Sequence, residues 1–195
     1  KTSRTFPVWM NVKTKPFNDV RVRRALSLAS DRKACLQTVL GGSGKVGAMV
    51  PESQVGGYDG VSPMPYYKHD VAAAKKLLAE AGHPNGIDLG DYIVVAANAL
   101  DVQCAQILQQ QWAAAGIKVN LKPMETAPLL SMWLKGEFGL LSVALAWSAD
   151  PDVIVSRLSS AHPHGKAMGM DDAALDKLIV DARAMLDNGK RAAAY

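Results

Sequence analysis

The sequence lacks any long apolar run. Although 49% of its 195 residues are hydrophobic, no stretch approaches the roughly 20 consecutive apolar residues that a transmembrane helix needs. The first residues, Lys1-Thr-Ser-Arg, are not followed by the apolar segment of a secretory signal. The chain starts without Met and stops at Tyr195 inside a helical pattern, so we expect it to be a piece of a longer protein.

Cysteine is scarce. The two cysteines, Cys35 and Cys104, both fall in predicted helices. Two cysteines do not define a disulfide framework, and they do not reveal the redox compartment. We interpret them as buried free thiols, which behave as small apolar side chains, and whether they pair is left open.

Aromatic residues make up only 6% of the chain, which matters for its basic N-terminal segment. Residues 1–33 carry nine Lys and Arg against two Asp, within a whole chain of net charge +4. A nucleic-acid surface would interleave stacking aromatics with its basic residues. We therefore interpret the basic residues as a solvated helix face and predict no nucleic-acid partner. The alternative, a nucleic-acid binder using residues 1–33, would lose affinity steeply with added salt.

Motifs that carry catalysis or bind metal are also missing. A phosphate-binding loop around Gly44-Lys45 would need Gly and Ser or Thr where Val39 and Val46 stand. A nucleophile elbow around Ser43 would need Gly in place of Lys45. His162-Pro-His164 offers two imidazoles, with no acidic or thiol group spaced to complete a site. We predict no catalytic residue, no metal and no cofactor. A hydrolase-like enzyme with a site dispersed in sequence is the alternative.

Hydrophobic periodicity predicts strands that alternate with helices. The predicted order is a strand at 6–12, helices at 19–30, 31–40 and 70–81, a strand at 92–96, a helix at 101–115, a strand at 117–122, a helix at 127–135, a strand at 140–146 and a helix from 172 past 186. The Gly- and Pro-rich stretch 41–68 is predicted to be a long irregular loop. In the last helix, Leu175, Leu178, Ile179 and Ala182 are expected to face inward.

The segment 92–122 carries the clearest topology. A strand, a helix and a second strand at this spacing form a βαβ unit, whose two strands run parallel. We therefore predict an α/β fold with a mixed, mostly parallel sheet that is flanked by helices.

Four ordered segments carry a family resemblance. They are Asn11–Arg32, which contains Pro16-Phe-Asn-Asp-Val-Arg-Val-Arg-Arg-Ala; Tyr67–Gly82, which contains Lys75-Lys-Leu-Leu-Ala-Glu-Ala-Gly; Ile107–Val119; and Trp147-Ser-Ala-Asp150-Pro-Asp152. Together they resemble the family 5 extracellular solute-binding proteins, which include the peptide- and nickel-binding proteins of ABC importers.

This resemblance implies a type II periplasmic-binding-protein-like lobe. Residues 1–195 would be the C-terminal lobe of a two-lobed protein, without the N-terminal lobe, and the strand at 6–12 would cross between lobes. The function implied is capture of a peptide or other small solute between the lobes and its delivery to the membrane subunits of an ABC permease. We expect a monomer in the periplasm or outside the cell, and leave open whether the full-length protein is anchored to the membrane.

The resemblance also points to a ligand site in the turn that begins at Trp147. In peptide-binding members of the family, an Asp in the Trp-x-x-Asp turn holds the α-ammonium of the ligand, and that position is Asp150. A carboxylate in a closed cleft forms a strong charge-assisted hydrogen bond with an ammonium. Trp147 would supply an apolar wall, with Ser148 beside it. The alternatives are that Trp147 is core and that Asp150 only caps the turn before Pro151. The identity of the ligand is left open.

Overall fold

A four-stranded sheet organises the computed structural model, which describes residues 4–47, 65–146 and 150–195. The strand order is β2 (Val8–Met10), β5 (Leu140–Ser142), β3 (Ile87–Val95) and β4 (Ile117–Met124). Strand β3 runs parallel to both β4 and β5, whereas β2 pairs antiparallel with β5. The predicted mixed, mostly parallel sheet is therefore confirmed.

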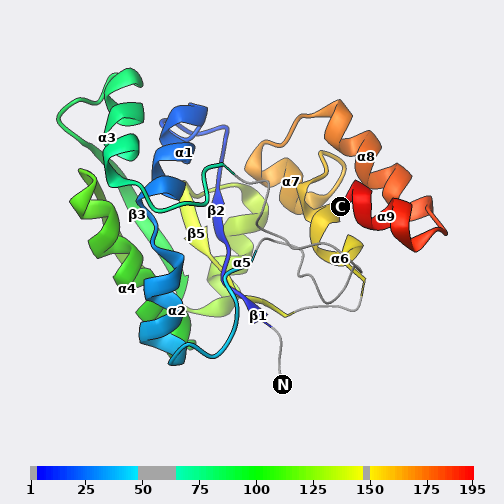
Figure 1. Ribbon diagram of the computed structural model, residues 1–195, viewed down its shortest axis with the longest axis horizontal. Helices are drawn as coiled ribbons and strands as arrows, with labels where there is room; N and C mark the ends of the chain where they lie inside the picture. Colours follow the sequence, from blue (N-terminus) through cyan, green and yellow to red (C-terminus); the bar gives the residue numbers. More distant parts are fainter. Residues whose placement is uncertain (1–3, 48–64, 147–149) are drawn as a thin grey trace.

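Each face of this sheet carries its own core, because successive side chains of β3 point to opposite faces. Tyr92 and Val94 join one core, whose helical residues come from α1 (Val20–Ala29), α3 (Val71–Glu80) and α4 (Ala99–Ala114). Ile93 and Val95 join the other, which includes residues of α5 (Thr126–Lys135), α6 (Asp152–Val155) and α7 (Pro163–Met168). In Figure 1, α1, α3 and α4 lie to the left of β2 and β5, and α6 and α7 lie to the right.

The predicted helix starts are confirmed at three aspartates. Asp19 accepts a hydrogen bond from the backbone N–H of Arg21, and Asp31 accepts one from Ala34 at the start of α2 (Arg32–Leu40). Asp70 accepts the equivalent bond from Ala73 at the start of α3. Each carboxylate satisfies a backbone N–H that has no partner within the first helical turn.

Two predicted strands are wrong in their bounds. The strand predicted at 6–12 is confined to β2, and a separate strand, β1 (Arg4–Thr5), precedes the predicted range. The strand predicted at 140–146 is two strands, β5 and β6 (Leu145–Ala146). Strand β1 pairs antiparallel with β6 in a separate two-stranded sheet. The strand pairing is interrupted at Pro7, which has no N–H to donate to a neighbouring strand.

Two further boundaries also differ. Strand β3 begins at Ile87 rather than at residue 92, because a register shift between Asp88 and Asp91 conceals the alternation of its first residues. Gly90 occupies a left-handed conformation at this irregularity, with φ of 72°. Helix α4 starts at Ala99, two residues before the predicted start.

The C-terminal helix that was predicted to run past residue 186 is wrong. Helix α8 (Ala173–Ala184) ends where Met185 becomes extended, and Asp187 caps a new helix, α9 (Asn188–Ala194). Leu178 was expected to be buried, yet it is 45% exposed. Helix α6, the 3-10 turn η2 (Ser156–Leu158) and helix α7 were not predicted, because they are too short to show periodicity.

The Tyr92 hydroxyl and the Ser142 hydroxyl form a buried hydrogen bond of 2.7 Å between β3 and β5. Burial raises the pKa of Tyr92, so the phenol stays neutral. We expect Tyr92→Phe to lower the free energy of unfolding by about 1 to 2 kcal/mol, because the Ser142 hydroxyl would lose its partner in the core. Urea denaturation measures this change. Tyr66→Phe is the control, since its ring would still lie under the guanidinium of Arg24. An equal loss in both variants would contradict the prediction.

Candidate ligand-binding site

The candidate site follows β6 in the chain. Strand β6 and strand β1 form the separate two-stranded sheet, which we call the β1–β6 ribbon. Strand β5 continues into β6 through Val143 and Ala144, and the chain reaches Asp150 four residues after β6 ends. Of the three predicted ligand-binding residues, the structure describes Asp150. Trp147 and Ser148 lie outside the described residues, so their predicted roles remain predictions.

Asp150 is held as an anion at the start of α6. Its Oδ1 atom accepts a hydrogen bond of 2.9 Å from the backbone N–H of Asp152 and one of 2.6 Å from Nη2 of Arg191. The Asp152 N–H is the main cause that lowers the pKa of Asp150; partial burial opposes it, and Arg191 lowers the pKa further. The side chain is 49% exposed. Asp150 therefore does cap its turn, as the alternative proposed, and it also presents a charged carboxylate to solvent.

A second carboxylate next to Asp150 has its own arginine. Oδ2 of Asp152 accepts a hydrogen bond of 2.9 Å from Nε of Arg183, and the Asp152 side chain is only 19% exposed. Arg183 lies in α8 and Arg191 in α9, so the two C-terminal helices each provide one guanidinium to this turn. Sequence reasoning missed both arginines, because nothing in their spacing links them to the turn more than 30 residues before them.

A cluster of aromatic rings in tilted and edge-to-face contact lies in the core on the side of α5 and α7. The ring centroids of Trp9 and Trp133 are 5.2 Å apart, and those of Trp133 and His164 are 4.3 Å apart. Burial is the main reason why the pKa of His164 falls to about 4, with Arg157 and His162 adding to the effect. His164 is therefore a neutral packing residue near pH 7.

Among the residues that the structure describes, none joins His162 and His164 as a third metal ligand. Their rings stack with centroids 5.1 Å apart, and Nδ1 of His162 accepts a hydrogen bond from the backbone N–H of His164. Over residues 4–47, 65–146 and 150–195, no group of three or more His, Cys, Asp and Glu side chains is placed to hold an ion.

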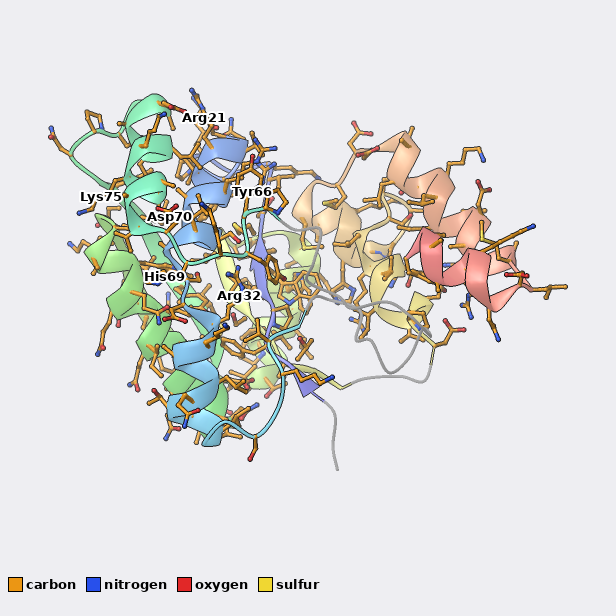
Figure 2. All side chains as sticks on the ribbon, in the orientation of Figure 1. Arg21, Arg32, Tyr66, His69, Asp70 and Lys75 are labelled. Atoms are coloured by element: carbon orange, nitrogen blue, oxygen red, sulfur yellow. The ribbon has the colours of Figure 1, made fainter. Side chains whose placement is uncertain are left out.

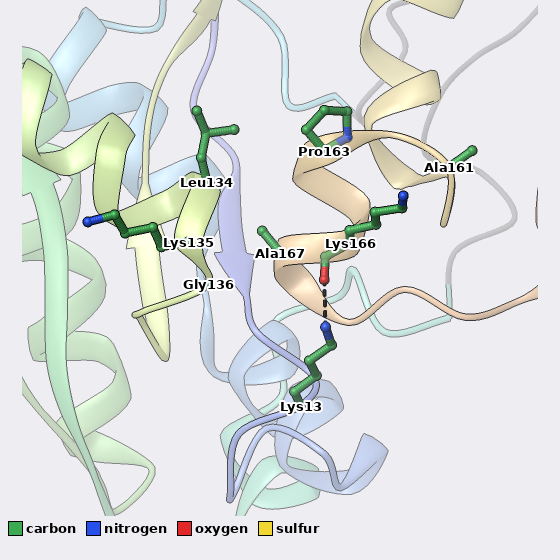
Figure 3. Close-up of a pocket in the computed structure, with 8 residues that line it drawn as sticks. All are labelled: Lys13, Leu134, Lys135, Gly136, Ala161, Pro163, Lys166 and Ala167. Atoms are coloured by element: carbon green, nitrogen blue, oxygen red, sulfur yellow. Dashed lines mark hydrogen bonds between the residues drawn. The ribbon is translucent and has the colours of Figure 1, made fainter.

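A pocket of about 420 Å³ lies between α5 and α7, and Asp150 is not among the residues that line it (Figure 3). Three lysines take part in its lining, and Nζ of Lys13 donates a hydrogen bond of 2.8 Å to the backbone carbonyl of Lys166. Its lining residues are Lys13, Leu134, Lys135, Gly136, Ala161, Pro163, Lys166 and Ala167. Because this lining contains no carboxylate, it does not suit an ammonium group.

The basic N-terminal residues are engaged in the fold itself. Arg21 forms an ion pair of 2.6 Å with Asp19. Arg32 donates to the backbone carbonyls of Ser27, Ser30 and Tyr67, and burial lowers its pKa. Figure 2 shows Arg32 and Tyr66 beside α1 and α2. The interpretation of the basic residues as a solvated helix face does not hold for Arg32, because its hydrogen bonds link Tyr67 to the C-terminal end of α1.

Known proteins resemble this chain along nearly all its length. Residues 1–165 match the family described as "Bacterial extracellular solute-binding proteins, family 5 Middle". Heme-binding protein A of Haemophilus influenzae is 31% identical over 95% of this chain. A probable di/tripeptide-binding protein of Pseudomonas aeruginosa is 31% identical over 96% of it. The chain spans 35% and 36% of the lengths of these two relatives.

Solved structures agree with the sequence matches. HbpA2 from Haemophilus parasuis has a TM-score of 0.85 at 29% identity, over 98% of this chain and 39% of that protein. A periplasmic binding protein, DppA from Helicobacter pylori, in complex with the peptide STSA, has a TM-score of 0.83 at 25% identity, over 98% of this chain and 38% of that protein. Among the helices in the described ranges, none has the length and apolar character needed to cross a membrane.

Proposed function

Because the chain belongs to the bacterial extracellular solute-binding proteins of family 5, we propose that it forms part of the substrate-binding component of an ABC importer. In this proposal, residues 1–195 are the C-terminal lobe of a two-lobed protein that closes over a peptide or a similar small solute. The share of each relative that the chain covers, about a third, supports a larger whole protein. The family consists of substrate-binding proteins, so the hydrolase alternative has no support.

The observation that carries the proposal is the half-exposed, charged carboxylate of Asp150. We propose that this carboxylate binds the α-ammonium group of the ligand, with Trp147 and Ser148 lining the cleft beside it. The backbone N–H of Asp152 holds the carboxylate in place. Arg191 pairs with this carboxylate while no ligand is bound, and an arriving ammonium would share the carboxylate with this guanidinium. A carboxylate that is fixed in advance loses little entropy on binding, which favours affinity.

The setting of the whole protein belongs to the same proposal. We propose that it works as a monomer outside the cytoplasm, free or anchored to the membrane, and delivers its solute to the membrane subunits of a permease. Closure of the two lobes would be the change that the permease recognises.

The test is calorimetry on the full-length protein with a panel of short peptides. We expect Asp150→Asn to weaken the binding of a peptide with a free α-ammonium about 100-fold, because the ligand charge would be buried without its counter-charge. The matched control is Asp152→Asn, whose carboxylate is paired with Arg183 and less exposed, and we expect it to change affinity far less. An N-acetylated peptide, which lacks the charge, should bind both variants and the unchanged protein with similar weak affinity.

The pKa of Asp150 adds a pH dependence to this test. Since its pKa lies below the ordinary value of 3.8, the carboxylate stays charged as the pH falls, and its contribution to binding is lost only below that value. A peptide α-amino group keeps its positive charge below its own pKa of about 8, so peptide affinity should stay constant between about pH 6.5 and pH 5. If free and acetylated peptides bound equally well, the assignment of Asp150 would be wrong. If no peptide bound, the proposed class of solute would be wrong.

A further inference from the structure

The two cysteines of the chain meet between two helices. Cys35 lies in α2 and Cys104 in α4, 69 residues apart in sequence, yet their Sγ atoms are 2.7 Å apart. Two sulfur atoms that do not share a bond stay farther apart than this. A small movement of either side chain would bring them to the bond length of a disulfide, about 2.05 Å. The predicted free thiols are unbonded in this structure, but they are half-buried rather than buried, and they contact each other.

Independent contacts hold the two helices in this register. The side chain of Gln111 in α4 accepts a hydrogen bond of 2.9 Å from the backbone N–H of Asp31 and donates one of 3.2 Å to its carbonyl. Asp31 in turn caps α2, one turn before Cys35. Cys104 and Gln111 are two helical turns apart, on the same side of α4. The contact between the two cysteines thus follows from the hydrogen bonds between Gln111 and Asp31, which fix α2 against α4.

Polar contacts hold the first turn of helix α2, but the helix has no buried residue. None of its residues, Arg32–Leu40, is buried, although the structure describes the helix in full. Its neighbour α1 buries five residues, among them Val22 and Leu26. A covalent link from Cys35 to α4 would supply to α2 the anchor that apolar packing supplies to α1.

The two thiols differ in their acidity. A hydrogen bond from Cys104 lowers the pKa of Cys35, and the same pairing together with burial raises the pKa of Cys104. The thiolate is the form of cysteine that attacks a disulfide. Cys35 is therefore the residue that starts an exchange reaction, and Cys104 is the one that completes it.

We propose that Cys35 and Cys104 form a disulfide that joins α2 to α4. The Cys35 thiolate attacks one sulfur of an external disulfide, either a protein or a small molecule, and expels one thiolate. Cys104 then loses its proton to solvent and attacks the Cys35 sulfur of this mixed disulfide, which expels the second thiolate. The pair loses two electrons and two protons, and the external disulfide is reduced to two thiols. An extracytoplasmic location would favour the oxidised form.

The test is a thiol count on the purified, folded chain after exposure to excess oxidised glutathione. We expect no free thiol under denaturing conditions without reductant, and two after reduction. A protease digest should give one peptide pair that contains both cysteines, without bound glutathione. Two remaining thiols, or glutathione bound to each cysteine, would overturn the proposal. Because the count needs neither a ligand nor a permease, its outcome is separate from that of the peptide-binding experiment.

Thermal unfolding gives a second measurement. A link across 69 residues restricts the unfolded chain, so we expect reduction to lower the midpoint by about 10 °C. The double variant Cys35→Ser with Cys104→Ser is the control, and its midpoint should not respond to the reductant. An equal response of the double variant and the oxidised chain would contradict the proposal.

Discussion

Replacing Trp133 with alanine is expected to lower the free energy of unfolding by about 4 kcal/mol. Trp133 lies in α5 and is 1% exposed, between Trp9 of β2 and His164 of α7. It therefore joins β2 to α7 within the core that also contains Ile154 of α6, the helix that starts beside Asp150. The cavity left by the indole would be lined by rigid backbone and by rings that cannot close it, so most of the lost contact energy would not be recovered.

Urea denaturation with fluorescence or circular dichroism measures this change. Two controls separate burial from other effects. Leu134→Ala removes an adjacent side chain of α5 that is 51% exposed, and it should cost less than about 1 kcal/mol. Trp133→Phe keeps most of the ring, and since the buried indole N–H has no hydrogen-bond partner among the described residues, it should cost much less than alanine. If Trp133→Ala lowered the free energy of unfolding no more than Leu134→Ala, the tight packing around Trp133 on which the prediction depends would be contradicted.

Gly165→Ala is expected to cost about 3 kcal/mol, although it adds a single methyl group. Gly165 is buried in α7, and a Cβ atom there would overlap the backbone carbonyl oxygen of Ser159 and lie 3.2 Å from that of Arg157. Backbone atoms cannot rotate away as the end of a side chain can. Helix α7 would have to move away from η2, which would disturb the packing of Met168 and Trp133.

The matched control for this substitution is Gly189→Ala in α9. The nearest atom there is a side-chain oxygen of Asp187 at 3.3 Å, and alanine favours the helix over glycine. We expect Gly189→Ala to leave stability unchanged or to raise it by up to about 1 kcal/mol. Comparable losses in the two variants would mean that the close approach at Gly165 does not decide the outcome.

Elements with local signals could be predicted from the sequence. The starts of α1, α2 and α3 follow from aspartates that accept hydrogen bonds within the next three residues. The βαβ unit follows from periodicity, and the stop of its helix from Gly116, whose φ is 84°. In each of these cases the cause lies within a few residues of its effect.

Elements that depend on distant partners could not be predicted. Residues 140–146 are apolar except for Ser142, and their division into β5 and β6 depends on which residues of β1 and β2 they meet. At the candidate site, the family resemblance pointed to Asp150, but its partner Arg191 lies in a helix that was predicted as the continuation of α8. The separate start of α9, capped by Asp187, is what brings Arg191 back to the turn.

The β1–β6 ribbon has a mechanical consequence. Its register ends at the pair Thr5 and Leu145, and the β2–β5 register begins at Val8 and Ser142, so two residues on each strand separate the ribbon from the sheet. Strand β5 is an interior strand, bordered by β2 and β3. A force applied to the segment that carries Asp150 would thus be transmitted to an interior strand, and the hydrogen bonds of β5 to both β2 and β3 would share the load. An edge strand, which has one neighbour, would be detached more easily.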